Sequence, residues 1–240
     1  MNTNGSIPYL KLPFQFNQER LLNDLSIIAE NKWIPHFNTA GYNGEWKVIP
    51  LYSQNGRDND IFALPVENPV IQETAILKAC DYMQEVINSF KVPILSARIL
   101  RLGKGAKIKP HKDHELGYEN NNFRLHIPIS TNDKVQFILD GVNIVMRPGE
   151  CWYTNVNYEH SVANEGKTDR VHLVIDGGRN EWSDKLFFSL APKERFRTAP
   201  KEIEDPETLR KIIDQLTLSN EPAAQSLIEQ LQQKLNQTAP

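Results

Sequence analysis

Apolar positions along the chain follow two different periodicities, which divide it into three zones. In the first zone, residues 1–93, apolar residues recur at helical spacing after Asn17, a candidate N-cap, and again in a set that ends before Pro93. The two sets are Leu21, Leu22, Leu25 and Ile28, and Ile76, Cys80, Met83, Ile87 and Phe90. We therefore predict two helices, with a turn-rich stretch between them that takes on strand character at its end.

The second zone, residues 94–178, contains short β-type runs instead of helical spacing. Turn signals separate the runs, and Asp140-Gly141 is a strong two-residue hairpin signal. The runs are ILSARILRL, AKIKPHKD, FRLHIPIS, VQFIL, VNIVM, ECWYTNV and RVHLVID. Many short strands at this spacing are typical of a sandwich or barrel, with the jelly roll among the options. The chain lacks the strand–helix alternation of a parallel α/β sheet, so that class is disfavoured.

The third zone returns to helical spacing. Asp205-Pro206 has the form of an N-cap with proline at the first helical position, and Asn220 is a candidate cap for a second helix. The apolar faces are Leu209, Ile212, Ile213 and Leu216, then Leu227, Ile228, Leu231 and Leu235. We predict a helical hairpin over residues 199–240, a candidate surface for a homodimer, attached to one domain of residues 1–198.

Composition and charge narrow the class of protein. The 240 residues are 40% hydrophobic and 24% charged, which suits one large soluble domain with an appendage. The net charge is -3 and no run of Lys or Arg forms a stripe, so we expect neither a nucleic-acid nor a membrane partner. Because no apolar stretch has the length of a signal peptide or a membrane span, we expect a cytoplasmic protein. Cys80 and Cys151 lie among apolar residues and are expected as buried free thiols, with one disulfide as the alternative.

Candidate metal ligands lie in the β zone. His111 and Asp113 are two residues apart, and such residues point to the same side of a strand. His160 follows a later strand and supplies a third ligand from a spatial neighbour. Two histidines and one carboxylate with open coordination positions form the site of the non-heme Fe(II) oxygenases. Zinc accepts the same ligands, and a lone His-x-Asp is usually a surface feature, so the three residues alone leave the metal open.

An arginine ten positions after His160 favours the iron site. Arg170 begins the apolar strand RVHLVID, where an unpaired guanidinium is costly. It is either exposed at the strand end or paired with a carboxylate inside the barrel. The second alternative provides a fork for the distal carboxylate of 2-oxoglutarate. We therefore expect Fe(II), 2-oxoglutarate and O2 as cofactor and co-substrates, with His172 on the same strand face as Arg170.

A second polar pair lies on another apolar strand. Arg124 and His126 in FRLHIPI share one face and indicate a second anion site, for the near carboxylate of the co-substrate or for a carboxylate of the substrate. The alternative is an outer, solvated face. Two further histidines are not assigned to the site: His114 points away from Asp113, and His36 is expected at the surface, with the pocket mouth as the alternative.

Six segments in this order and spacing resemble the bacterial aspartyl/asparaginyl β-hydroxylase family. They are LPFQFNQERLLNDL, WIPHFNTAGYNGEWKVIPLY, RILRLGKGAKIKPHKD, FRLHIPISTN, FILDGVNIVMRPGECWYTNV and HSVANEGKTDRVHLVID, and they cover roughly Pro8 to Trp182. The resemblance implies a mainly β, double-stranded β-helix (jelly roll, cupin-like) with flanking N-terminal helices, and a 2-oxoglutarate- and Fe(II)-dependent dioxygenase. The hairpin of residues 199–240 lies outside it.

The resemblance also implies roles for single residues. The iron ligands are His111, Asp113 and His160, and the residue for the distal carboxylate is Arg170. Arg124 and His126 occupy positions that contact the near carboxylate or the substrate. Proline commonly precedes the distal histidine in the family, whereas this chain has Glu159.

Together these features favour a hydroxylase that acts on an unactivated C–H of an amino acid, a peptide or a related carboxylate. Family members differ widely in substrate, so the resemblance leaves the substrate open. Two alternatives remain: a jelly-roll binding module without catalysis, and a zinc or nickel cupin enzyme that does not use O2. The intact set of His111, Asp113, His160 and Arg170 argues against both.

Overall fold

A computed structural model describes residues 6–61, 70–113 and 115–197, together with positions 213, 231, 232 and 235. The chain divides into a unit of Ser6–Arg197 and a second unit of Met1–Gly5 with Thr198–Pro240. The first unit contains both of the β-sheets and the candidate site. The predicted hairpin of residues 199–240 lies outside the described residues, apart from the four single positions, and so does His114.

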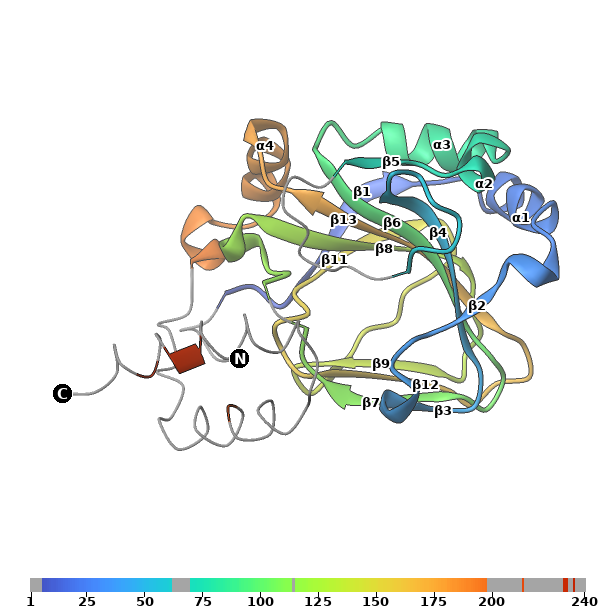
Figure 1. Cartoon of the computed structure of the whole chain (residues 1–240). Helices are drawn as coiled ribbons and strands as arrows, with labels where there is room; N and C mark the ends of the chain where they lie inside the picture. The colour runs from blue at the N-terminus through green and yellow to red at the C-terminus, as the bar shows by residue number, and fades with distance from the viewer. Residues whose placement is uncertain are drawn as a thin grey trace. The chain divides into compact units, whose positions relative to one another are not determined.

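Two antiparallel sheets face each other in the first unit (Figure 1). The large sheet has the order β1-β11-β8-β13-β6-β4-β2, with β5 beside β4, and the small sheet has the order β10-β9-β12-β7-β3. The strands of the large sheet are β1 (Tyr9–Gln15), β2 (Ile34–Pro35), β4 (Trp46–Gln54), β5 (Ile71–Glu73), β6 (Ile94–Leu102), β8 (Asn122–Ser130), β11 (Glu150–Thr154) and β13 (Arg170–Gly178). Those of the small sheet are β3 (Tyr42–Asn43), β7 (Lys107–His111), β9 (Val135–Leu139), β10 (Val142–Asn143) and β12 (His160–Asn164).

From β6 onward, the chain passes back and forth between the two sheets. β6, β8, β11 and β13 lie side by side in the large sheet, and β7, β9, β10 and β12 lie together in the small sheet. This order is that of a jelly roll. The predicted mainly β fold is therefore confirmed. The Asp140-Gly141 hairpin is confirmed as well, because both residues have positive φ (49° and 74°) and Leu139 pairs with Val142.

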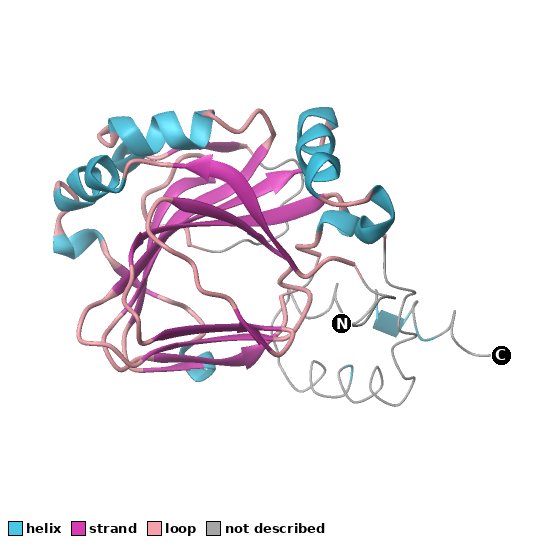
Figure 2. Ribbon diagram, turned by 180° about the vertical axis from the view of Figure 1, so that it is seen from behind, coloured by secondary structure: helices cyan, strands magenta, loops and turns pink. Residues whose placement is uncertain are grey.

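Short helices cover the outer face of the large sheet (Figure 1 and Figure 2). They are α1 (Gln18–Ser26), α2 (Ala75–Lys78), α3 (Asp81–Asn88) and α4 (Glu181–Leu190); the 3-10 turns are η1 (Glu30–Lys32), η2 (Thr39–Gly41), η3 (Tyr118–Asn120) and η4 (Lys193–Phe196). Asn17 caps α1, because its side chain accepts the N–H of Arg20. The single helix predicted to end at Phe90 is instead two helices, α2 and α3. The break is stabilised by Asp24, whose carboxylate accepts the N–H of Met83 at 2.7 Å.

The central strands β8 and β13 of the large sheet are buried on both faces, and the two faces of the sheet differ in chemistry. Toward the helices it presents apolar side chains such as Ile99, Leu125 and Leu173. Toward the small sheet the large sheet presents apolar residues mixed with polar ones. By strand alternation these polar residues are the half-buried Arg98 and the buried Arg124, His126, Arg170, His172 and Asp176. The space between the sheets is therefore where charged chemistry is concentrated.

Candidate metal centre and its pocket

Two histidines meet across the small sheet. His111 ends β7, His160 begins β12, and the register of the two strands places them directly opposite each other. Their ring centroids are 4.2 Å apart. Two histidines that are 49 positions apart in sequence thus offer nitrogen ligands to one point in space.

Asp113 completes the cluster from just beyond the end of β7. Its backbone N–H donates to the carbonyl of Val156 at 2.9 Å, which fixes the segment after the strand. One ligand atom from each of His111, Asp113 and His160 lies within 4.8 Å of the other two. The sequence argument treated His111 and Asp113 as neighbours on a strand; only His111 is in the strand, but both side chains reach the same point.

Local backbone contacts select the tautomer of both histidines. Nδ1 of His111 is 2.8 Å from the carbonyl of Lys109, and Nδ1 of His160 is 3.1 Å from the carbonyl of Tyr158. A carbonyl only accepts, so each Nδ1 carries the proton and each Nε2 keeps its lone pair for a metal. Burial and the neighbouring His111 lower the pKa of His160 to about 4, so its ring is neutral near pH 7.

The carboxylate of Asp113 is ionised and its two oxygens have different surroundings. Burial opposes ionisation, but Arg124 and the two histidines outweigh it and lower the pKa of Asp113. Arg124 Nη1 donates to Oδ2 at 2.5 Å, while Oδ1 lies 3.8 Å from Nε2 of His111. The structure therefore leaves Oδ1, on the side of the histidines, as the oxygen available to a metal ion.

Arg170 is a buried cation without a carboxylate partner among the described residues. It begins β13 and is 2% exposed. Its Nη2 donates to Nδ1 of His172 at 3.0 Å, and its Nε has no hydrogen-bond partner in the described part of the chain. Burial lowers its pKa to about 9. Leaving a guanidinium in this state is costly, so the site favours an anionic ligand that reaches Arg170.

His126 is the second group with an orphaned polar atom in the same place. It is 5% exposed, and its Nδ1 has no partner among the described residues. Its ring lies 5.4 Å from Phe137 and 5.6 Å from His172, centroid to centroid. Burial and the nearby Arg170 and Arg124 lower its pKa well below 6.5, so it is neutral.

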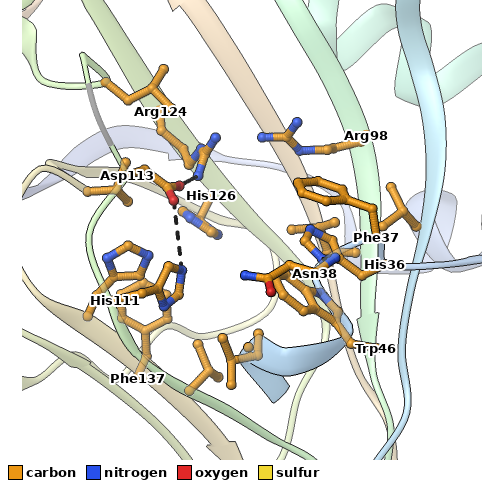
Figure 3. A pocket seen from close by; sticks show the side chains of 18 of the residues that line it. His36, Phe37, Asn38, Trp46, Arg98, His111, Asp113, Arg124, His126 and Phe137 are labelled. Carbon is orange, nitrogen blue, oxygen red and sulfur yellow. Dashed lines mark hydrogen bonds and ion pairs between the residues drawn. The ribbon is translucent and has the colours of Figure 1, made fainter. Parts of the chain in front are cut away.

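The cluster and these groups line one cavity of about 310 Å³ (Figure 3). The wall opposite the metal cluster is formed by residues that the sequence argument did not assign to the site. Arg98 lies there, on β6, with Nη2 donating to Asp176 at 2.9 Å. Next to it, His36 stacks on Trp46 with ring centroids 3.5 Å apart, and Phe37 and Asn38 continue the wall. His36 is half-buried and lines the pocket, which was the alternative to the expected surface position.

Two remaining expectations concern the cysteines and the membrane. Cys80 and Cys151 are buried free thiols, as predicted. Among the described residues, no helix is long and apolar enough to span a bilayer.

The sequence matches a family model described as aspartyl/asparaginyl beta-hydroxylase over residues 15–180, which is more than half of the chain. The chain belongs to this family. The resemblance predicted from the sequence is therefore confirmed, and the family match spans all of the residues that form the metal cluster and its pocket.

Two curated relatives of this member of the aspartyl/asparaginyl β-hydroxylase family carry names that state an activity. L-proline cis-3-hydroxylase 1 of Streptomyces sp is 30% identical over 168 residues, which are 68% of this chain and 57% of the relative. L-proline cis-4-hydroxylase of Rhizobium meliloti (strain 1021) is 26% identical over 202 residues, which are 83% of this chain and 66% of the relative. The chain thus covers less than two thirds of either relative's length. A solved structure from Burkholderia pseudomallei, described as an oxidoreductase of the 2OG-Fe(II) oxygenase family, is 14% identical, with a TM-score of 0.48 over 68% of this chain and 79% of its own.

We predict that the metal-free protein loses stability as the pH falls below about 6.5. Burial and the nearby Arg170 lower the pKa of both His126 and His172 well below 6.5 in the folded chain. These histidines take up protons more readily when unfolded. Their contribution to the free energy of unfolding is therefore complete above pH 6.5 and is lost as the pH falls toward the folded pKa.

Urea denaturation of the metal-free protein from about pH 8 to pH 5 measures this loss. His172→Gln keeps an acceptor for Arg170 without the titrating ring, so its stability should decline less steeply. A free energy of unfolding that stays constant over this range would contradict the prediction.

Proposed function

We propose that this chain is an Fe(II)- and 2-oxoglutarate-dependent hydroxylase of a small amino acid. One observation carries the proposal. Two Nε2 lone pairs and one carboxylate oxygen converge in a cavity that also contains Arg170, a buried guanidinium without a carboxylate partner in the described chain. A metal with free coordination positions and an anionic co-substrate together satisfy both groups.

The residues present fit the proposed metal. His111, His160 and Asp113 would hold it through Nε2, Nε2 and Oδ1, and the Nδ1–carbonyl contacts already hold both rings in the required tautomer. When bound, Fe(II) supplies the activation of O2 by which a C–H bond becomes C–OH while 2-oxoglutarate is converted to succinate and CO2. The donor set also accepts zinc, so the choice of iron over zinc depends on the co-substrate site.

For the co-substrate, we assign the distal carboxylate to Arg170. Its guanidinium is held by His172, a neutral acceptor, so its positive charge is not cancelled within the described protein. His126 lies on the neighbouring strand, and its unpaired Nδ1 is available to the same ligand. The apolar side chains of Phe137 and Val162 line the cavity beside these groups and exclude water around the ion pair.

Arg124 receives a different role in this proposal from the one expected. It donates to Asp113 and, through two of its nitrogens, to Asp176, so its hydrogen bonds are directed at protein carboxylates. We assign it to holding Asp113 and not to contacting a ligand.

The substrate end of the cavity is assigned to Arg98 and the His36–Trp46 stack. Three arginines and two aspartates face this space, so positive charge is in excess and a carboxylate-bearing substrate is favoured. A cavity of about 310 Å³ is at the lower end of the range for small-molecule sites. The names of both relatives specify hydroxylation of L-proline, a free amino acid. A free amino acid fits this space better than a protein side chain on a folded partner.

We expect Arg98→Leu to weaken binding of the amino acid substrate selectively. A hydrogen bond to a charged group contributes about 1.5–3 kcal/mol, which corresponds to a rise in the half-saturating substrate concentration of roughly 10- to 150-fold. The affinity for 2-oxoglutarate should stay near that of the wild type. Succinate formation measured against substrate concentration tests this, and Arg98→Lys, which keeps the charge, should fall in between. An unchanged half-saturating concentration would move the substrate site elsewhere.

The proposal itself is tested in two steps on the full chain. Without O2, Fe(II) and 2-oxoglutarate together should give a weak visible absorption band that neither gives alone with the protein. With O2, a panel of free amino acids including L-proline, acylated amino acids and short peptides should identify one class that stimulates succinate release. A band without stimulation by any class would exclude the tested substrate classes and leave the iron and co-substrate sites in place. The absence of the band would favour the binding module or the non-oxidative cupin enzyme, because neither of them predicts it.

A further inference from the structure

Asp176 lies at the centre of the inner face of the large sheet. It is 4% exposed, and its register partners are Arg124 on β8 and Ser96 on β6. Its Oδ1 accepts Arg124 Nε at 2.7 Å, and its Oδ2 accepts Arg124 Nη2 at 3.0 Å. One edge of the Arg124 guanidinium is therefore held in a bidentate contact by this carboxylate.

Two further donors fix the carboxylate of Asp176 itself. Ser96 Oγ donates to Oδ2 at 3.0 Å, and Arg98 Nη2 donates to the same oxygen at 2.9 Å. Arg124 and Arg98 together outweigh the cost of burial and keep the pKa of Asp176 well below its usual range. Because donors from Arg124, Arg98 and Ser96 converge on it, the ionised carboxylate of Asp176 is held in one orientation.

The opposite edge of Arg124 faces the metal cluster. Its Nη1 donates to Oδ2 of Asp113. Because the guanidinium is planar and rigid, its placement on Asp176 determines where Nη1 lies and hence which oxygen of Asp113 is engaged. Asp113 is outside any strand, so the backbone alone does not orient its carboxylate.

We propose that Asp176 is a positioning residue for the metal site: acting through Arg124, it holds Oδ2 of Asp113 so that Oδ1 is presented beside His111 and His160. This inference rests on the proposed function, because it assumes that Asp113 binds a metal. Among the described residues, Asp176 reaches the metal ligand Asp113 through Arg124, so its effect on the metal site is indirect. Partners of this kind typically change metal affinity by about 10- to 100-fold.

The simpler explanation is that Asp176 only neutralises two buried arginines. In that case its removal lowers the stability of the fold, and any change in metal affinity is independent of Arg124. A double-mutant cycle separates the two explanations, since residues that act in series have non-additive effects.

The experiment measures Fe(II) affinity without O2 in the full chain and in Asp176→Asn, Arg124→Gln and the double variant. We expect Asp176→Asn to bind Fe(II) about 10- to 100-fold more weakly. Arg124→Gln should be at least as weak, and the double variant no weaker than Arg124→Gln alone. Unchanged affinity in Asp176→Asn, or losses that multiply in the double variant, would overturn the inference.

Two additional variants make the result specific. Asp184→Asn makes the same chemical change at a carboxylate that pairs with Arg179 and Tyr118, outside the cavity, and should bind Fe(II) like the wild type. Arg124→Lys leaves Asp176 intact and keeps the charge but cannot span two carboxylates. If Asp176→Asn does not fold, Arg124→Lys decides: a loss of about tenfold or more supports the inference, and wild-type affinity overturns it.

The same measurements distinguish failure of this inference from failure of the proposed function. If the wild type itself binds no Fe(II), or if Asp113→Ala binds it equally well, the proposed function fails together with this inference. If the wild type binds Fe(II) and Asp113→Ala does not, but Asp176→Asn equals the wild type, only the inference fails. Thermal melting of each metal-free variant separates loss of fold from loss of affinity.

Discussion

His160→Ala should bind Fe(II) more weakly than any other single variant of the metal cluster. His160 is the only one of the three proposed ligands that comes from β12, so its loss leaves His111 and Asp113 on one short stretch of chain. Asp113→Ala instead leaves two histidines that face each other directly across β7 and β12. We expect the loss in His160→Ala to exceed the ~10- to 100-fold range of indirect partners, and the loss in Asp113→Ala to be smaller.

Metal content after anaerobic reconstitution, measured together with succinate formation, tests both variants. In Asp113→Ala, 2-oxoglutarate should still reach Arg170. We therefore expect this variant to lose iron affinity while it keeps part of its affinity for the co-substrate. His160→Gln serves as a control of similar size without an imidazole. Wild-type turnover in His160→Ala or Asp113→Ala would disprove the iron assignment and the proposed function with it.

Arg170→Leu should strongly weaken binding of 2-oxoglutarate and at the same time stabilise the metal-free protein against unfolding. Truncating one partner of a buried charged pair costs about 2–5 kcal/mol, which is a rise in the half-saturating concentration of roughly 30-fold to more than 1,000-fold. Without ligand, however, Arg170 is a buried charge with no carboxylate partner in the described chain. An apolar side chain at this position removes that cost, so the melting temperature of the metal-free variant should rise.

Titration of 2-oxoglutarate and thermal melting measure the two opposite effects. Fe(II) affinity should be unchanged, because Arg170 does not contact the three proposed ligands. Arg170→Lys should retain part of the co-substrate affinity, since it keeps a charge but loses the fork. A half-saturating concentration equal to that of the wild type would move the distal carboxylate to another residue, and a lower melting temperature would mean that Arg170 is part of the fold's support.

The sequence predicted the parts of this protein in which local pattern and local structure agree. The β-type runs of residues 94–178 contain strands β6 to β13 of the two sheets, whereas β1 lies in the first zone, which was expected to be helix and loop. His111, Asp113 and His160 were singled out because their residue types are unusual together. The single helix ending at Phe90 was wrong because its break depends on Asp24, a residue of another helix. Periodicity within a segment carries no information about such a contact.

Arg98 was missed for a related reason. On β6, alternation normally separates a buried face from a solvated one, but this strand is covered on both sides by helices and by the small sheet. In the sequence, Arg98 cannot be told apart from Arg101 on the same strand. In the structure, however, Arg101 pairs with the exposed Glu30 outside the cavity. His36 was placed at the surface because it follows the short strand β2, and its partner Trp46 comes from β4, ten positions later.

The carbonyl that orients each histidine of the cluster belongs to the residue two positions earlier in the same chain segment. Ring orientation is thus encoded in three consecutive residues and needs no side chain from elsewhere in the protein. The contact uses a backbone carbonyl and the histidine ring, so the side chain of the middle residue, Pro110 or Glu159, does not enter it. The proton position on both rings is thus set within three residues of chain at each histidine, before any metal or co-substrate arrives.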